Sequence, residues 1–160
     1  MSNRNLEPDS IIENLGFLLG KSCHIKDRLL DQYLLPEDIT STQGKVLFQI
    51  YHLRFNRPSH IGKSLNVDNS AITRMLDRLE KKELIRRLPD PEDRRSIVIT
   101  LTDTGVDVVE RALPLAAQAI DELTQALTAE EIEQLRHCLQ KIITSALPEN
   151  CQDTYLKGSN

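Results

Sequence analysis

Residues 68–101 constrain the fold of this chain most strongly, because an amphipathic helical pattern there runs directly into two β-prone segments. Four apolar residues recur at helical spacing and predict one buried face: Ile72, Met75, Leu76 and Leu79. The opposite face is polar and carries Ser70, Thr73, Arg74, Asp77 and Lys81. A polar ridge of this width fits the major groove of duplex DNA, so the pattern favours a helix that contacts bases.

The two β-prone segments enclose a turn that contains two prolines. They cover residues 84–88 and 96–101, with residues 89–93 between them, and we expect an antiparallel hairpin. This hairpin places Arg94 and Arg95 at its tip, where a guanidinium can reach a phosphate or a narrow minor groove. Helix followed by hairpin is therefore the arrangement of a DNA-binding winged helix.

Three further helices are expected before this stretch. The first covers residues 10–34 and ends before Pro36. The second begins at a capping box formed by Thr40 and Gln43. The third begins at Pro58, because proline is favoured at the first helical position. A tight turn joins this third helix to the polar one, which predicts a helix-turn-helix.

Two long helices are expected after the hairpin. The first begins near Thr102 and contains Pro114, which we expect to kink it at a cost on the order of 3 kcal/mol unless the bend is used. The second begins at a capping box of Thr128 and Glu131 and ends near Pro148. Both carry apolar seams at heptad spacing. Such seams bury each other within one chain or pair with a second copy, and the pattern favours a second copy.

Together these elements predict a mostly α fold with a small β-hairpin wing, a winged helix-turn-helix with N- and C-terminal dimerisation helices. Residues 36–101 would form the DNA-binding domain, and residues 1–35 and 102–148 the dimerisation helices. Residues 149–160 are polar and predict a flexible tail.

The net charge of −4 conceals an uneven distribution of charge. Residues 57–95 hold 10 basic and 7 acidic side chains, a net of +3, whereas residues 1–56 carry −1 and residues 96–160 carry −6. The basic excess coincides with the expected helix and hairpin. Because the excess is small, we expect duplex affinity that is sensitive to salt and requires a dimer. The alternative is that these charges only keep the surface soluble.

Composition excludes several other classes of protein. A chain of 160 residues suits one domain that buries roughly 70% of its unfolded surface. We expect a cytoplasmic protein, because no run of about 18 apolar residues and no signal-like segment is present. Low aromatic content without tryptophan argues against stacking of single-stranded bases. No phosphate loop or hydrolase motif surrounds His52 or His60, so we expect no enzyme and no cofactor.

The three cysteines, Cys23, Cys138 and Cys151, are an odd number without CxxC spacing and fit reduced thiols. The pairs Cys23-His24 and His137-Cys138 invite a metal or redox interpretation. Adjacent helical residues point about 100° apart, however, so one pair cannot readily give both ligands to one ion. We expect no metal site, and the sequence does not decide whether a cysteine has a redox role.

Three segments of the sequence resemble the MarR family of bacterial transcription regulators. They are Asp27-Arg-Leu-Leu30 with Asp38-Ile-Thr40 and Lys45-Val-Leu47; Ala71-Ile-Thr-Arg-Met-Leu-Asp-Arg-Leu79; and Arg87-Leu-Pro-Asp-Pro-Glu-Asp-Arg-Arg95 running to Leu101-Thr102. The family's Asp-x-Arg wing signature falls on Asp93 and Arg95. The resemblance covers nearly the whole chain.

The resemblance implies a homodimeric repressor, connected with antibiotic or stress resistance, that presents two winged helices to a pseudo-palindromic operator with half-sites about 34 Å apart. It implies that Thr73 and Arg74 touch base edges or nearby phosphates, and that Arg95 enters the minor groove. Asp93 would fix the wing tip by pairing with a neighbouring arginine. Arg78 would contact DNA or tie the helix to the wing. The expected DNA-binding residues are Ser70, Thr73, Arg74, Asp77, Arg78, Lys81, Asp93, Arg94 and Arg95.

The resemblance also implies a small phenolic or aromatic carboxylate effector that releases the DNA. The residues expected to line its site are Pro58, Thr73, Arg78 and Arg87. An arginine beside a hydroxyl can hold a carboxylate, although Arg87 has the alternative of a DNA or salt-bridge role. Tenfold weaker DNA binding needs about 1.4 kcal/mol of differential effector affinity. Lys81 stands where close relatives carry a cysteine, so thiol sensing is not expected there.

The sequence leaves two alternative functions open. One is a winged-helix module that binds a protein partner, and the other is a redox- or metal-responsive regulator of the same family. The Asp-x-Arg wing and the basic excess in residues 57–95 argue against the protein-binding module.

Overall fold

A computed structural model describes residues 14–53, 56–91, 93 and 95–146 of the chain. Its elements are α1 (Leu15–Tyr33), a 3₁₀ turn η2 (Leu35–Glu37), α2 (Ser41–Phe48), a π-helical turn η3 (Gln49–Leu53), α3 (Pro58–Leu65), α4 (Asn69–Lys81), β1 (Ile85–Pro89), β2 (Ile97–Leu101), α5 (Asp103–Thr124) and α6 (Ala129–Ala146). The described residues are therefore mostly helical with one small hairpin, as the sequence predicts. The expected tail, residues 149–160, lies outside the described residues.

Helix starts follow the expected caps. The Gln43 N–H donates to Thr40 Oγ1 at 3.2 Å, and the Thr40 N–H donates to Gln43 Oε1 at 3.1 Å. The same reciprocal pair joins Thr128 and Glu131 before α6. Asp68 caps α4 with its carboxylate. Each cap satisfies backbone donors that a helix leaves unpaired at its start, so these sequence signals are confirmed.

Three boundaries differ from the sequence-based expectation. α1 begins at Leu15 after an Asn14 cap, and residues 10–13 of the expected first helix lie outside the described residues. The second helix ends at Phe48, and the backbone continues as the wider turn η3, in which Tyr51 donates to Glu110 of α5 at 3.1 Å. β1 and β2 each begin one residue later than expected, and β1 also ends one residue later. In the hairpin, Arg87 pairs with Ile99. α5 continues as one helix through Pro114.

The core lies where α2, α3, α4, the hairpin and the first half of α5 meet. Its largest fully buried side chains are Leu34, Leu47, Ile61, Ile72, Leu76, Leu79, Ile85, Ile99, Val46 and Val109. Three of the four apolar residues expected on the inner face of the polar helix are among them, and Met75 is half-buried against the same cluster. The core therefore fixes which face of α4 points outward.

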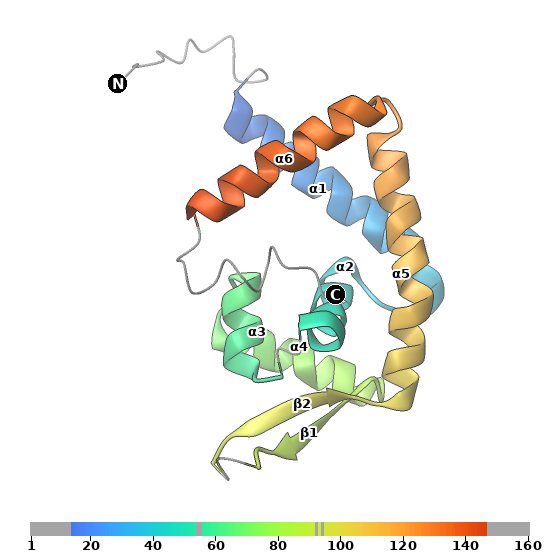
Figure 1. The fold of residues 1–160 in the computed structure, drawn as a ribbon. Helices are drawn as coiled ribbons and strands as arrows, with labels where there is room; N and C mark the ends of the chain where they lie inside the picture. Colours follow the sequence, from blue (N-terminus) through green and yellow to red (C-terminus); the bar gives the residue numbers. More distant parts are fainter. Residues whose placement is uncertain (1–13, 54–55, 92, 94, 147–160) are drawn as a thin grey trace.

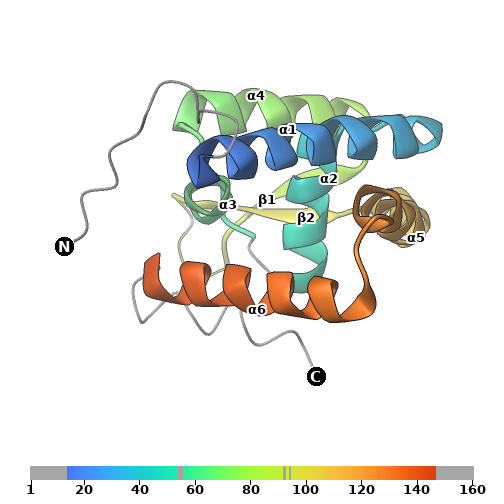
Figure 2. The same cartoon turned by 90° about the horizontal axis from the view of Figure 1, so that it is seen from above.

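Figure 1 shows the hairpin at one end of the molecule and α1 with α6 at the other, connected by α5. α1 and α6 cross in that view, but Figure 2 shows them separated in depth. No described residue of α6 is buried, and its exposed apolar side chains include Leu135, Leu139, Ile142 and Ile143. No helix within the described part of the chain is long and apolar enough to cross a membrane.

Candidate nucleic-acid interface

The polar ridge of α4 faces solvent over its whole length. Its exposed residues are Ser70, Thr73, Arg74, Asp77, Arg78 and Lys81. The helix presents this ridge because Ile72, Leu76 and Leu79 on the opposite face are almost completely buried. The ridge is thus held by the core but free to meet another molecule.

The start of α4 is organised by Asp68. Its carboxylate accepts from the Ser70 hydroxyl at 2.5 Å and from the Ala71 N–H at 2.8 Å. These two hydrogen bonds hold the pKa of Asp68 below its usual value, and the nearby charge of Arg74 acts in the same direction. The Thr73 hydroxyl donates to the Asn69 carbonyl oxygen at 2.7 Å. Both hydroxyl protons are therefore already used, and their oxygens remain able to accept hydrogen bonds.

Three cations of the ridge have no salt-bridge partner in the described part of the chain: Arg74, Arg78 and Lys81. Unpaired guanidinium and ammonium groups on one exposed helix face attract phosphates and can donate to base edges. The expectation that Arg78 ties the helix to the wing is not met. Arg87 of β1 makes that connection, through Asp77 at 2.6 Å.

Asp93 shapes the turn at the wing tip. It accepts from the Arg95 backbone N–H at 3.0 Å and from the Ser96 hydroxyl at 2.8 Å. Those hydrogen bonds lower the pKa of Asp93. An aspartate two residues before an N–H readily closes such a local turn, and the positive charge of Arg57 also lowers the pKa of Asp93. That Asp93 pairs with a neighbouring arginine stays a prediction. Arg95 is exposed beside this turn, and Arg94 lies outside the described residues.

A second ion pair anchors the wing near its tip, where β1 ends, and it is not predicted from the sequence. The Asp90 carboxylate is only 4% exposed and accepts from Arg57 Nη2 at 2.6 Å. Arg57 immediately precedes α3, so the wing is tied to the helix-turn-helix. These partners are 33 residues apart in the chain. No local signal in the sequence predicts this pair, because Asp90 is an ordinary charged residue of a proline-containing turn.

The four residues expected to line an effector site do not share a pocket. Pro58 and Thr73 line a surface pocket of about 350 Å³, together with Arg95 of the wing. Arg78 lines a different pocket of about 330 Å³ beside α2. Thr73 and Arg78 are five residues apart, which turns them about 140° from each other on a helix. Arg87 lines neither pocket, since Asp77 and Glu80 hold its guanidinium.

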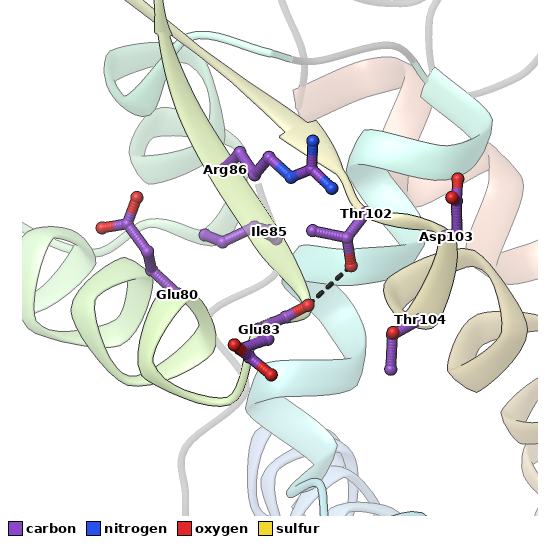
Figure 3. A pocket seen from close by; sticks show the side chains of 7 residues that line it. All are labelled: Glu80, Glu83, Ile85, Arg86, Thr102, Asp103 and Thr104. Carbon is purple, nitrogen blue, oxygen red and sulfur yellow. Dashed lines mark hydrogen bonds between the residues drawn. The ribbon is translucent and has the colours of Figure 1, made fainter.

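Another pocket, of about 400 Å³, lies between the end of α4, β1 and the start of α5 (Figure 3). The Thr102 hydroxyl donates across it to the Glu83 carbonyl oxygen at 2.6 Å. Three of the side chains around it are acidic, from Glu80, Glu83 and Asp103, against one arginine, Arg86. This charge makes the pocket unsuitable for an aromatic carboxylate.

A family model described as the MarR family matches residues 39–97. The multiple antibiotic resistance protein MarR of Escherichia coli K12 is 42% identical over 130 residues, which cover 78% of this chain and 90% of that protein. The chain belongs to the MarR family. MarR of Salmonella typhimurium LT2 is 44% identical and covers 81% and 90% of the two chains.

Solved structures of family members agree with the fold. A cysteine-to-serine variant of E. coli MarR in complex with operator DNA is 40% identical, with a TM-score of 0.74 over 86% of this chain and 99% of that one. The predicted winged helix-turn-helix fold is thereby confirmed. Curated relatives of this MarR-family chain include an HTH-type transcriptional repressor, NicR of Pseudomonas putida, at 28% identity. These are regulators, which confirms the expectation that the chain is not an enzyme.

Two cysteines of this MarR-family chain lie among the described residues, in α1 and α6. Cys23 of α1 and Cys138 of α6 are both exposed free thiols, and Cys151 lies outside the described residues. Within the described ranges, no group of three or more histidine, cysteine or acidic side chains could hold a metal ion. Neither thiol lies on the ridge of α4 or on the wing.

Proposed function

We propose that this MarR-family chain is a sequence-specific double-stranded DNA-binding transcriptional repressor that acts in the cytoplasm. The observation that carries the proposal is the exposed ridge of α4, with three cations that form no salt bridge among the described residues, beside a wing that presents Arg95. A helix with this ridge fits the major groove, and an arginine at a hairpin tip fits the adjacent minor groove. The structure of an E. coli MarR variant in complex with operator DNA supports the proposal that this chain binds DNA.

The side chains of the ridge divide by reach and chemistry. Arg74 lies in the middle of the exposed face and would contact a base edge, with the Ser70 and Thr73 oxygens as acceptors for base donors. Arg78 and Lys81 lie toward the end of the helix and would contact phosphates. Asp93 keeps the wing turn in shape so that Arg95, with Arg94, can approach the minor groove.

We further propose that the functional form is a homodimer built by residues 1–35 and 102–148, with residues 36–101 as the DNA-binding part. The uncovered apolar side chains of α6 support this, because a face of several leucine and isoleucine residues is costly to leave in water. The N-terminal end of α1 also exposes apolar side chains, those of Leu15, Phe17 and Leu18. A second copy that covers both faces would present two α4 helices to a pseudo-palindromic operator.

A small phenolic or aromatic carboxylate effector is proposed to release the DNA. The pocket shared by Pro58, Thr73 and Arg95 supports a site that joins α3, α4 and the wing. A carboxylate there could pair with the guanidinium of Arg95. Because Thr73 and Arg95 are also proposed DNA contacts, an occupied pocket would compete with the operator.

The test is a gel shift of the purified full chain on the DNA upstream of its own gene across a salt series. We expect binding at about 50 mM salt that weakens steeply toward about 200 mM, because several phosphate contacts release counterions. A duplex of the same length and shuffled sequence should compete poorly. Absence of binding at about 50 mM salt would exclude the proposed function.

A further inference from the structure

Arg87 of β1 lies between two carboxylates of α4. Its Nη2 is 2.6 Å from Asp77 Oδ1, and its Nη1 is 2.6 Å from Glu80 Oε2. The Arg87 backbone N–H also donates to Glu80 Oε1 at 3.3 Å. We call these three residues the helix-wing clamp.

The clamp has a simple geometric basis. Asp77 and Glu80 are three residues apart, so they point from the same side of α4. Arg87 is opposite Ile99 in the hairpin, and its side chain emerges on the face of β1 that meets α4. A guanidinium donates from a rigid planar fork, so two short bonds to separate carboxylates fix both its position and its orientation.

We propose that Asp77 and Glu80, acting through Arg87, are positioning residues that set the distance between α4 and the wing. They would thereby set the number of base pairs between the major-groove contacts and the minor-groove contact of one half-site. This inference rests on the proposed DNA-binding function. It moves Asp77 from a DNA contact to a residue that acts through Arg87.

Charge argues against a direct DNA contact by the clamp. Two carboxylates against one guanidinium leave it with a net charge of −1, which repels phosphate. The Arg87 side chain is also only 25% exposed, compared with 56% for Asp77. An arginine held in this way has little freedom to follow a DNA backbone.

The clamp complements the other tie of the wing. Arg57 and Asp90 join the end of β1 near the wing tip to the start of α3. The clamp joins the middle of the same strand, β1, to the second half of α4. With both ties in place, helix and wing move as one rigid body, and DNA in which the two grooves are wrongly spaced binds less well.

The test uses a duplex that the wild-type full chain selects from a random library. Two derivatives of this duplex have one base pair inserted or deleted between the bases that α4 would contact and the flanking minor groove that the wing would contact. Arg87→Gln and the double variant Asp77→Asn with Glu80→Gln break the clamp. Arg86→Gln is the matched control, because it removes the same charge from the neighbouring residue, for which the described residues show no salt bridge. Arg87→Lys keeps the charge without the fork.

Wild type and Arg86→Gln should bind the selected duplex about tenfold more tightly than the shifted duplexes, the usual effect of a faulty site. The clamp variants should lose most of this preference. Arg87→Lys should recover it only in part. The slope of log K against log salt should stay at the wild-type value for Arg87→Gln, because no phosphate contact is lost.

A drop in that slope by about one for Arg87→Gln would show a phosphate contact and overturn the proposal. The proposal is also overturned if both clamp variants keep the wild-type preference among the three duplexes. Because the wild type still binds DNA in that case, the proposed function stays intact. A wild type that selects no duplex overturns both. Circular dichroism melting of each variant confirms that any loss of preference occurs in a folded protein.

Discussion

Gly105 lies directly against the Leu84 carbonyl oxygen, so closely that a Cβ on Gly105 would be only 2.0 Å from that atom. The contact joins the first turn of α5 to the segment that leaves α4. Thr102 strengthens the same junction, since its hydroxyl donates to the Glu83 carbonyl oxygen at 2.6 Å and accepts from the Gly105 N–H at 2.9 Å. The helix proposed to form the dimer therefore begins against the end of the helix proposed to contact DNA.

We expect Gly105→Ala to destabilise the fold by about 3 kcal/mol or more, because the new methyl group must displace backbone. Gly62→Ala is the matched control, since a Cβ there meets its nearest atom, the Val67 carbonyl oxygen, at an ordinary 3.4 Å. Urea unfolding of the two variants measures the difference. Similar midpoints for both would contradict the close contact.

Acid should weaken the wing through Asp93. The Arg95 N–H and the Ser96 hydroxyl lower the pKa of this carboxyl in the folded chain. A group whose folded pKa is lowered stabilises the fold above its unfolded pKa of about 3.9, and this contribution is lost as the pH falls through the folded value. In urea unfolding from about pH 7 to about pH 3, Asp93→Asn should therefore lose less stability than wild type. If wild type and Asp93→Asn lost the same stability over this pH range, the proposed role of the Asp93 carboxylate would be contradicted.

The proposed dimer predicts the effect of a charge on the apolar face of α6. Leu139→Lys should shift the full chain from dimer to monomer in sedimentation velocity, because an ammonium group would be buried without a partner. DNA binding should weaken with it. His137→Lys places the same charge on another side of α6 and should leave the dimer intact. A dimer that persists in Leu139→Lys would place the interface elsewhere.

Arg74 and Arg95 should behave differently on specific and random DNA. Arg74→Ala should cost about 1 to 3 kcal/mol on the selected operator and little on random duplex, if it contacts a base. Arg95→Ala should weaken binding to most sequences. Fluorescence anisotropy on both duplexes measures the two losses, and equal losses on both for Arg74→Ala would exclude a base contact.

Local signals in the sequence were enough to predict the ridge of α4. The buried triplet Ile72, Leu76 and Leu79 repeats at helical spacing, so it defines the exposed face without knowledge of the fold. The capping boxes at Thr40 and Thr128 are also local, because each joins residues three apart. Such patterns are visible before any tertiary contact exists.

Contacts between distant segments could not be predicted in the same way. Arg57 and Asp90 are ordinary charged residues in the sequence, and only the folded chain brings them to 2.6 Å. Arg87 was expected at an effector site or in a DNA or salt-bridge role, and the fold places it in a salt bridge to Asp77 and Glu80. Gly105 carries no local signal, since the reason for a glycine there is the Leu84 carbonyl of another segment.

Selection of duplexes from a random library by the purified full chain, followed by sequencing, tests the central claim most directly. A dimer that presents two α4 helices should enrich an inverted repeat whose half-site centres are about 34 Å, or about 10 base pairs, apart. Arg74→Ala should lose the enriched bases while it still binds DNA. Selection that enriches no sequence, or only a single half-site without a repeat, would contradict a dimeric, sequence-specific DNA-binding protein.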